Sequence, residues 1–170
     1  RLVKSAPRDP VAKQTLVDAL NYTTTAHTLR GGLDKARLLG EEAVKLSEQL
    51  VRERPDSEND LMRLAMLSKQ LADVYSKGDS RDKALPLFER NLELRKKLYD
   101  RAPEDARRQQ RLAEAHNWLA TELFWAKDFA RGEVHTREAL RLDELRGKKY
   151  PREARANIAS EAPPDPREFI

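Results

Sequence analysis

The side chains of this 170-residue chain that could most readily hold a metal ion are its three histidines. The chain has no cysteine. His135 and Glu138 are three residues apart, so on a helix they share one face and could form half of a metal site. An ordinary solvated pair is the simpler interpretation of these two side chains. Without cysteine, disulfide frameworks, zinc knuckles, thiolate catalysis and iron–sulfur clusters are excluded. We therefore predict a protein that is not an enzyme, with no catalytic residue, no metal site and no cofactor.

The charge balance describes a mixed surface. There are 33 basic and 29 acidic residues, for a formal net charge of +4. No apolar run approaches the ~18 residues that a membrane-spanning helix requires, so we expect no membrane partner. The absence of cysteine suits a reducing compartment, and on that ground we expect a cytoplasmic location.

The elements that carry these side chains follow an internal period. Pro7, Pro55, Pro103 and Pro151 are each 48 residues apart, with no insertion needed to keep the register. The same step relates further sets of apolar and small residues: Leu16, Leu64 and Leu112; Leu46, Leu94 and Leu142; Leu2, Leu50 and Leu98; Ala36, Ala84 and Gly132. Self-similarity at a fixed period is typical of repeat architectures.

Each unit is predicted to contain two helices. Apolar residues follow helical spacing on both sides of a short break, which falls at 30–32, 77–80 and 126–128. Gly at such a break can take a positive φ, and Asp or Ser can cap the next helix. The next proline then ends the second helix. Pro86 is expected within about a turn of its helix start, where a missing N–H is tolerated. Because alternating patterns are scarce, we predict an all-α fold.

The units resemble the tetratricopeptide repeat (TPR) family. The second unit carries the motif best, and the third keeps part of it, with Gly132 in place of alanine. The first unit departs most, with Thr23, Thr24, His27 and Gly40 at motif positions. The residues that carry the resemblance are Leu71, Ala72, Tyr75, Ala84, Phe88 and Pro103; Leu119, Ala120, Ala139 and Pro151; Ala36 and Ala43.

The resemblance implies a right-handed solenoid of three helical hairpins with partial helices at both ends. The family's unit is about 34 residues long, so 48 residues lengthen both helices of each hairpin. Comparable long units are similar to those of bacterial multidomain signalling proteins, including serine/threonine kinases. The expected organisation is an array over 1–162, made of 1–6 as the end of a preceding repeat, repeats at 7–54, 55–102 and 103–150, a capping helix at 151–162, and then a tail at 163–170.

The resemblance further implies that the first helix of each hairpin lines a concave groove in which a partner lies. Asn and Gln side chains can bond a peptide backbone through both donor and acceptor, and exposed Trp side chains can act as anchors. The projected groove residues are Asp18, Asn21, Tyr22, Thr25 and Leu29; Met66, Lys69, Gln70, Asp73 and Lys77; Glu114, Asn117, Trp118, Thr121, Phe124 and Trp125. The added turns extend these rows with Gln14, Asn59, Met62, Arg107 and Gln110.

The leading hypothesis is a non-enzymatic interaction module, the regulatory or scaffold part of a larger protein, that binds a peptide or helical segment in this groove. The family's clamp for acidic chaperone tails is not predicted, because Glu114 and Trp118 occupy positions where positive groups belong. One alternative is a structural spacer or self-association module with an empty groove. Another is nucleic-acid binding through an Arg-rich third unit in which acidic residues are interleaved: Arg101, Arg107, Arg108, Arg111, Arg131, Arg137 and Arg141.

Overall fold

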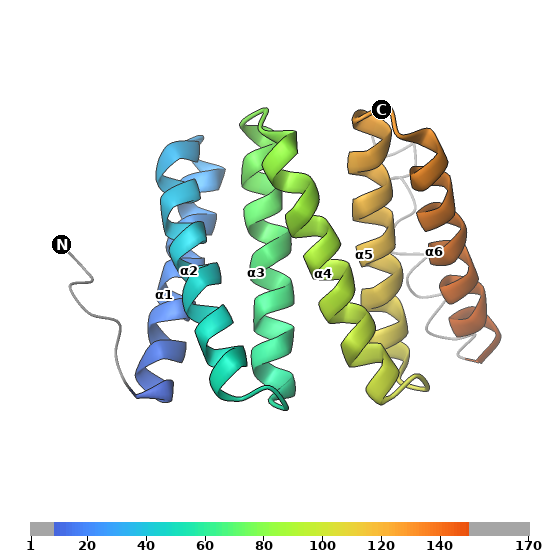
Figure 1. Cartoon of the computed structure of the whole chain (residues 1–170), viewed down its shortest axis with the longest axis horizontal. Coiled ribbons are helices and arrows are strands. Elements are labelled where there is room, and N and C mark those ends of the chain that lie inside the picture. Colours follow the sequence, from blue (N-terminus) through green and yellow to red (C-terminus); the bar gives the residue numbers. More distant parts are fainter. Residues whose placement is uncertain (1–8, 150–170) are drawn as a thin grey trace, which may run out of the picture.

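The computed structural model describes residues 9–149, which form six α-helices joined by short connections (Figure 1). In chain order the helices are α1 (Pro10–Leu29), α2 (Leu33–Glu53), α3 (Glu58–Lys77), α4 (Arg81–Arg101), α5 (Ala106–Trp125) and α6 (Phe129–Lys149). No strand occurs within these residues. The predicted all-α fold is confirmed.

The helix boundaries repeat with the period of the sequence. α1, α3 and α5 each have 20 residues and begin at Pro10, Glu58 and Ala106, which are 48 residues apart. α2, α4 and α6 each have 21 residues and keep the same step. The chain therefore contains three equivalent hairpins.

The first helix of every hairpin starts at a side-chain cap. The caps are Asp9, Ser57 and Asp105, again 48 residues apart. Asp9 accepts a hydrogen bond from the Ala12 amide at 2.9 Å, and the other two caps accept from the amide three residues on in the same way. Such caps satisfy amide groups that lack a partner within the helix.

The first helix ends in a shared turn. Gly31, Asp79 and Lys127 have φ values of 76°, 57° and 62°. The next amide in each turn donates back to a helical carbonyl, at 2.8 to 2.9 Å. This is the Schellman geometry. In the second hairpin the left-handed residue is Asp79, whereas Gly78 has a φ of −87° and caps the helix.

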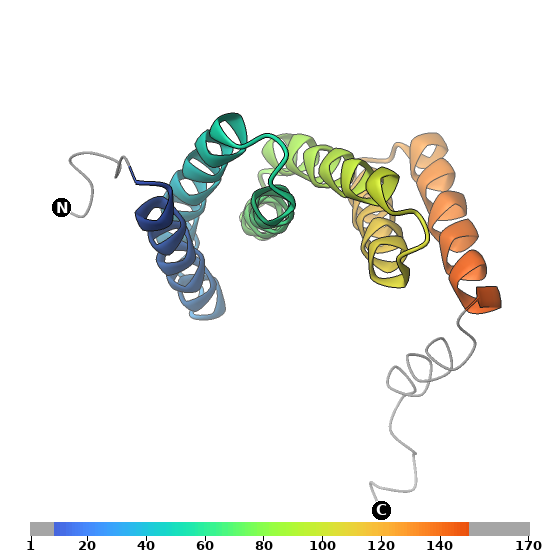
Figure 2. The same cartoon turned by 90° about the horizontal axis from the view of Figure 1, so that it is seen from below.

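The helices pack in chain order, each against the next, so the hairpins stack as a solenoid. Seen along the helices, α1, α3 and α5 lie on one side of the array, and α2 and α4 lie on the other (Figure 2). Equivalent leucines occupy equivalent buried places: Leu46, Leu94 and Leu142 are all buried, as are Leu50 and Leu98. One apolar cluster runs from Val17 in α1 to Leu123 in α5. Neighbouring hairpins therefore share a core, as repeat proteins do.

Pro86 lies deeper in its helix than the sequence predicts. Pro86 lies inside α4, five residues after the helix begins at Arg81, so it removes an internal hydrogen bond, contrary to the expected first-turn position. The expected end of a preceding repeat (1–6), capping helix (151–162) and tail (163–170) lie outside the described residues.

Candidate functional site: the groove between α3 and α5

The projected groove residues all lie on the first helices, and none of the sixteen that form its main rows is buried. Tyr22 and Trp125 are 75% and 65% exposed, which is unusual for large aromatic side chains. The two junctions between hairpins nevertheless differ. The first, between α1 and α3, is bridged by side chains, and the second, between α3 and α5, is open.

At the first junction, polar side chains of α1 and α3 pair with each other. Asp18 forms an ion pair with Arg63, and Thr25 accepts a hydrogen bond from Gln70. Near the start of the helices Gln14 donates to Asp60 at 3.0 Å. Most of the polar groups expected to meet a partner here are therefore engaged within the array.

At the second junction, a methionine replaces the bridging carboxylate. Met66 is the counterpart of Asp18, so Arg111, the counterpart of Arg63, pairs instead with Glu114 of its own helix at 2.9 Å. A pocket of about 520 Å³ opens between α3 and α5. Its lining is Asn59, Met62, Arg63, Met66, Lys69, Asn91, Arg95, Arg111 and Trp118.

Cations lie against the aromatic side chains of this groove. The ammonium of Lys69 lies 4.7 Å from the ring centre of Trp118 and also bonds Asp73 at 2.6 Å. The guanidinium of Arg81 lies 5.0 Å from the ring centre of Trp125. Both distances are within the range of cation–π attraction. These contacts hold Trp118 half-buried on the groove wall, while Trp125 remains exposed.

The floor of the pocket comes from α4. Asn91 is buried and donates to the Ala65 carbonyl at 2.6 Å, while its Oδ1 accepts no hydrogen bond from the described residues. Arg95 follows one turn later, half-buried, and its Nε also lacks a partner. A second pocket of about 260 Å³ adjoins the first and shares Met62, Arg95 and Arg111 with it. Arg95 therefore lies where the two hollows meet.

The surroundings of Arg95 are electropositive. Desolvation by burial lowers the pKa of Arg95, and the nearby charge of Arg111 lowers it further, whereas Glu114 acts in the opposite direction. The guanidinium stays charged at neutral pH because its ordinary pKa is so high. The array thus holds a charged group in a place that is unfavourable for it.

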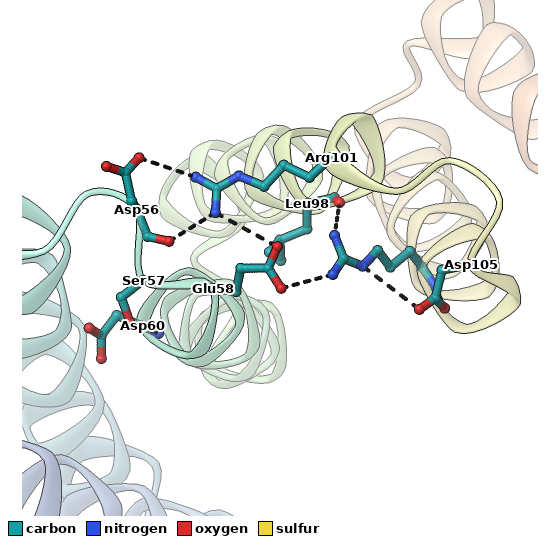
Figure 3. Close-up of polar contacts among 8 residues, drawn as sticks. Asp56, Ser57, Glu58, Asp60, Leu98, Arg101 and Asp105 are labelled. Carbon is teal, nitrogen blue, oxygen red and sulfur yellow. Dashed lines mark hydrogen bonds and ion pairs between the residues drawn. The ribbon is translucent and has the colours of Figure 1, made fainter.

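An ion-pair network lies at the start of α3 (Figure 3). Glu58 lies between two arginines: Arg108 of α5 approaches at 2.8 Å and Arg101 of α4 at 3.9 Å. Arg101 also donates to the Asp56 carbonyl at 3.0 Å, and Arg108 to the Leu98 carbonyl at 2.7 Å. This network joins three helices beside the second pocket.

The structure brings only part of the predicted set to the open pocket. Met66, Lys69 and Trp118 line it, together with Asn59 and Met62 from the added turns. Sequence reasoning missed Asn91 and Arg95 because it considered first helices only. Alignment of the units at the 48-residue step could have indicated both residues. Asn91 aligns with Ala43 and Ala139, and Arg95 aligns with Ser47 and Asp143.

No group of three metal-ligating side chains occurs within residues 9–149. His135 meets His116 of α5, with the two Nδ1 atoms 3.0 Å apart, whereas Glu138 binds Arg141 at 2.6 Å. The pairing of His135 with Glu138 considered from the sequence is therefore replaced by a histidine pair. Burial, followed by the neighbouring His135, lowers the pKa of His116 to about 4.

The arginines of the third unit are mostly neutralised. Arg131 pairs with Glu89 at 2.5 Å, Arg137 with Glu133 at 2.5 Å, and Arg141 with Glu138. Arg101, Arg108 and Arg111 are also in ion pairs, which leaves Arg107 as the member of the set without one in the described part of the chain. The region presents alternating charge rather than a basic stripe.

Comparisons with known proteins relate the chain to one helical architecture. No protein-family model and no curated protein matches it. Among solved structures, it is similar to the crystal structure of BtubC (BKLC) from P. vanneervenii, with 21% identity and a TM-score of 0.61. The match covers 84% of this chain and 50% of that protein, so the chain spans about half the length of its structural neighbour. Across the described helices, none is both long and apolar enough to cross a bilayer. The chain therefore has an all-α helical-repeat fold like that of BtubC.

Proposed function

We propose that the chain is a non-enzymatic protein-interaction module of the TPR type that binds a peptide or helical segment in the groove between α3 and α5. The observation that carries the proposal is the open second junction, where methionine and tryptophan side chains stay accessible between charged groups. Isolated apolar side chains are normal on a surface, but several gathered in a hollow are typical of a binding site.

The chemistry of the lining suits a peptide. Met62 and Met66 are 43% and 41% exposed, and methionine adapts its shape to different apolar side chains. Trp118 offers a large surface with few rotatable bonds, which favours a role as an anchor. The expected process is regulation or scaffolding within a larger, cytoplasmic signalling protein.

Alanine substitution of groove residues tests the proposal. We would replace Asn59, Met62, Met66 and Lys69, which all line the pocket between α3 and α5, and compare pull-down partners and melting temperature with those of the unchanged chain. The expected result is loss of partners with a melting temperature within a few degrees of the original, since all four side chains are at least partly exposed.

A matched control replaces four exposed residues of the second helices: Lys45, Glu93, Lys97 and Arg137. This variant should keep its partners. If both variants keep the same partners and the same melting temperature, the groove is not the binding surface.

A spacer or self-association module remains the second candidate, and α6 favours it. Leu140 is the counterpart of Leu92, which packs against the apolar cluster of the third hairpin. Leu140 itself is 58% exposed, and Val134 of the same helix is 60% exposed. Light scattering during size exclusion would detect self-association, and replacing Leu140 by Glu would abolish it if this face pairs. Nucleic-acid binding is less well supported, because most arginines of the third unit are paired with carboxylates.

A further inference from the structure

We infer that Arg95 is an anion-binding anchor, and that the partner of the groove presents a carboxylate side chain, Asp or Glu, to it beside an apolar residue. The inference rests on the proposed function and names the class of partner. It places the anchor on the second helix α4, at the floor between α3 and α5.

Arg95 differs from the other cations around the two hollows. Arg63, Lys69, Arg108 and Arg111 each have a carboxylate partner in the array. Arg95 forms no ion pair within residues 9–149, although it is more enclosed than Arg111. Arg107 is also unpaired in this part of the chain, but it lies exposed at the rim of the second hollow.

The position is special to one junction. The counterparts of Arg95 are Ser47 and Asp143, and those of its neighbour Asn91 are alanines. A half-buried guanidinium that has lost part of its hydration is unfavourable unless something compensates it. A scaffold that needed only packing here would keep the small residue found in the first hairpin. The polar floor therefore has a use that the repeat fold itself does not require.

The fork of a guanidinium matches a carboxylate with two parallel hydrogen bonds. The attraction is strengthened where water is partly excluded, as on this floor. Met62, Met66 and Trp118 line the first pocket together with Arg95. The combination selects an acidic side chain next to an apolar one.

A protein segment fits this place better than a nucleic acid. The unpaired charge is a single group at the floor of a hollow of about 520 Å³, with methionines on its wall. A phosphate backbone is instead tracked by a row of free cations along a surface. The remaining cations near the groove are mostly paired, so a continuous row is missing from the described helices.

The test starts from a displayed library of random 15-residue peptides, selected on the 170-residue chain. Selected sequences are synthesised with a fluorescein label, and their binding is measured by anisotropy against the unchanged chain, Arg95→Gln and Lys97→Gln. Lys97 is exposed on the same helix and lines neither hollow, so the control removes the same charge. A fluorescent 20-nucleotide oligothymidine is measured in parallel.

We expect the selected peptides to be enriched in Asp or Glu beside apolar residues. Affinity should fall about tenfold or more for Arg95→Gln, as for a charged hydrogen-bonded pair, and stay within twofold for Lys97→Gln. Replacing the acidic residue of the peptide by Gln or Asn should cost a similar factor with the unchanged chain and little with Arg95→Gln.

The outcomes separate this inference from the proposed function. Peptides that lose affinity for a Trp118→Ala chain but ignore Arg95→Gln would overturn the acidic anchor and leave the groove in place. Peptides indifferent to every groove substitution, or no selected peptide at all, would count against both. Tighter binding of the oligothymidine than of any peptide, lost in Arg95→Gln, would assign the anchor to phosphate and overturn the inference.

A second variant excludes a merely structural role for the arginine. Arg95→Met keeps a long side chain and removes the partly buried, unpaired charge. The melting temperature should rise or stay the same while peptide affinity still falls about tenfold or more. A lower melting temperature together with unchanged affinity would identify Arg95 as a packing residue and overturn the inference.

Discussion

The ring of Phe124 fills the space that a side chain at position 132 would need. An ideal Cβ built on Gly132 would lie 2.4 Å from Cε1 of Phe124 and 2.6 Å from its Cδ1. In the second hairpin the corresponding residues are Ala84 and Ser76. The loss of a methyl group on α6 is thus matched by a larger side chain on α5, and the departure of Gly132 from the family motif has a local physical reason.

Gly132→Ala should therefore destabilise the chain, by about 1–3 kcal/mol, because the overlap with Phe124 outweighs the gain in helix propensity. Combining it with Phe124→Ser reproduces the pair of the second hairpin and should recover most of the loss. Urea unfolding of both single variants and the double variant measures the coupling. Additive effects would show that the two residues do not constrain each other.

Lys127→Gly should stabilise the chain by about 1 kcal/mol. Lys127 has a φ of 62°, a conformation that costs a lysine but not a glycine, and the equivalent residue of the first hairpin is Gly31. Thermal or urea unfolding measures the gain. Ala126→Gly is the control, because Ala126 has an ordinary φ of −76° and gains nothing from glycine. Equal effects at both positions would contradict the argument.

Glu58→Gln should lower the free energy of unfolding by about 1 kcal/mol, because Glu58 joins Arg101 and Arg108 and also lies in the first turn of α3. The loss should shrink at 1 M NaCl, where these charges are screened. Glu93→Gln is the control, since Glu93 is exposed on α4 and has no ion pair among the described helices. A loss that does not depend on salt would point to packing instead.

The period of the sequence predicted the fold because each hairpin repeats the same local signals. Asp9, Ser57 and Asp105 cap at the same step, and the leucines of the core recur with them. The position of the left-handed residue in each turn was harder to predict. Asp79 and Lys127 adopt the left-handed conformation, although a glycine, Gly78, directly precedes Asp79.

The candidate site could be predicted only in part. The family rows include Met66, Lys69 and Trp118, which line the pocket between α3 and α5. They could not show that Asp18 would be tied to Arg63 across the first junction, because pairing between helices depends on their separation. Arg95 was missed because the pocket that it lines forms between two hairpins. Such a pocket cannot be predicted from one repeat unit alone.

The contact between His116 and His135 makes the third hairpin sensitive to acid. Their Nδ1 atoms are 3.0 Å apart across α5 and α6, so one neutral ring donates Nδ1–H to the Nδ1 of the other. The accepting Nδ1 cannot be protonated without losing this bond. Burial is the main cause that lowers both pKa values, that of His116 to about 4. Glu138 and Arg141 act on His116 in opposite directions, as do Glu89 and Arg131 on His135.

Because the folded pKa of His116 lies below its unfolded value of about 6.5, the unfolded chain binds more protons between these values. The stability contributed by the neutral pair is therefore present above pH 6.5 and is lost as the pH falls toward 4. We expect the unchanged chain to lose about 1 kcal/mol more than His116→Gln between pH 7 and pH 5, a figure reduced from the full shift because both rings are only partly buried. Urea unfolding at several pH values measures the difference, and a double variant that also carries His135→Gln should show the shallowest pH dependence. Parallel curves for the unchanged chain and His116→Gln would mean that the pair is not coupled to folding.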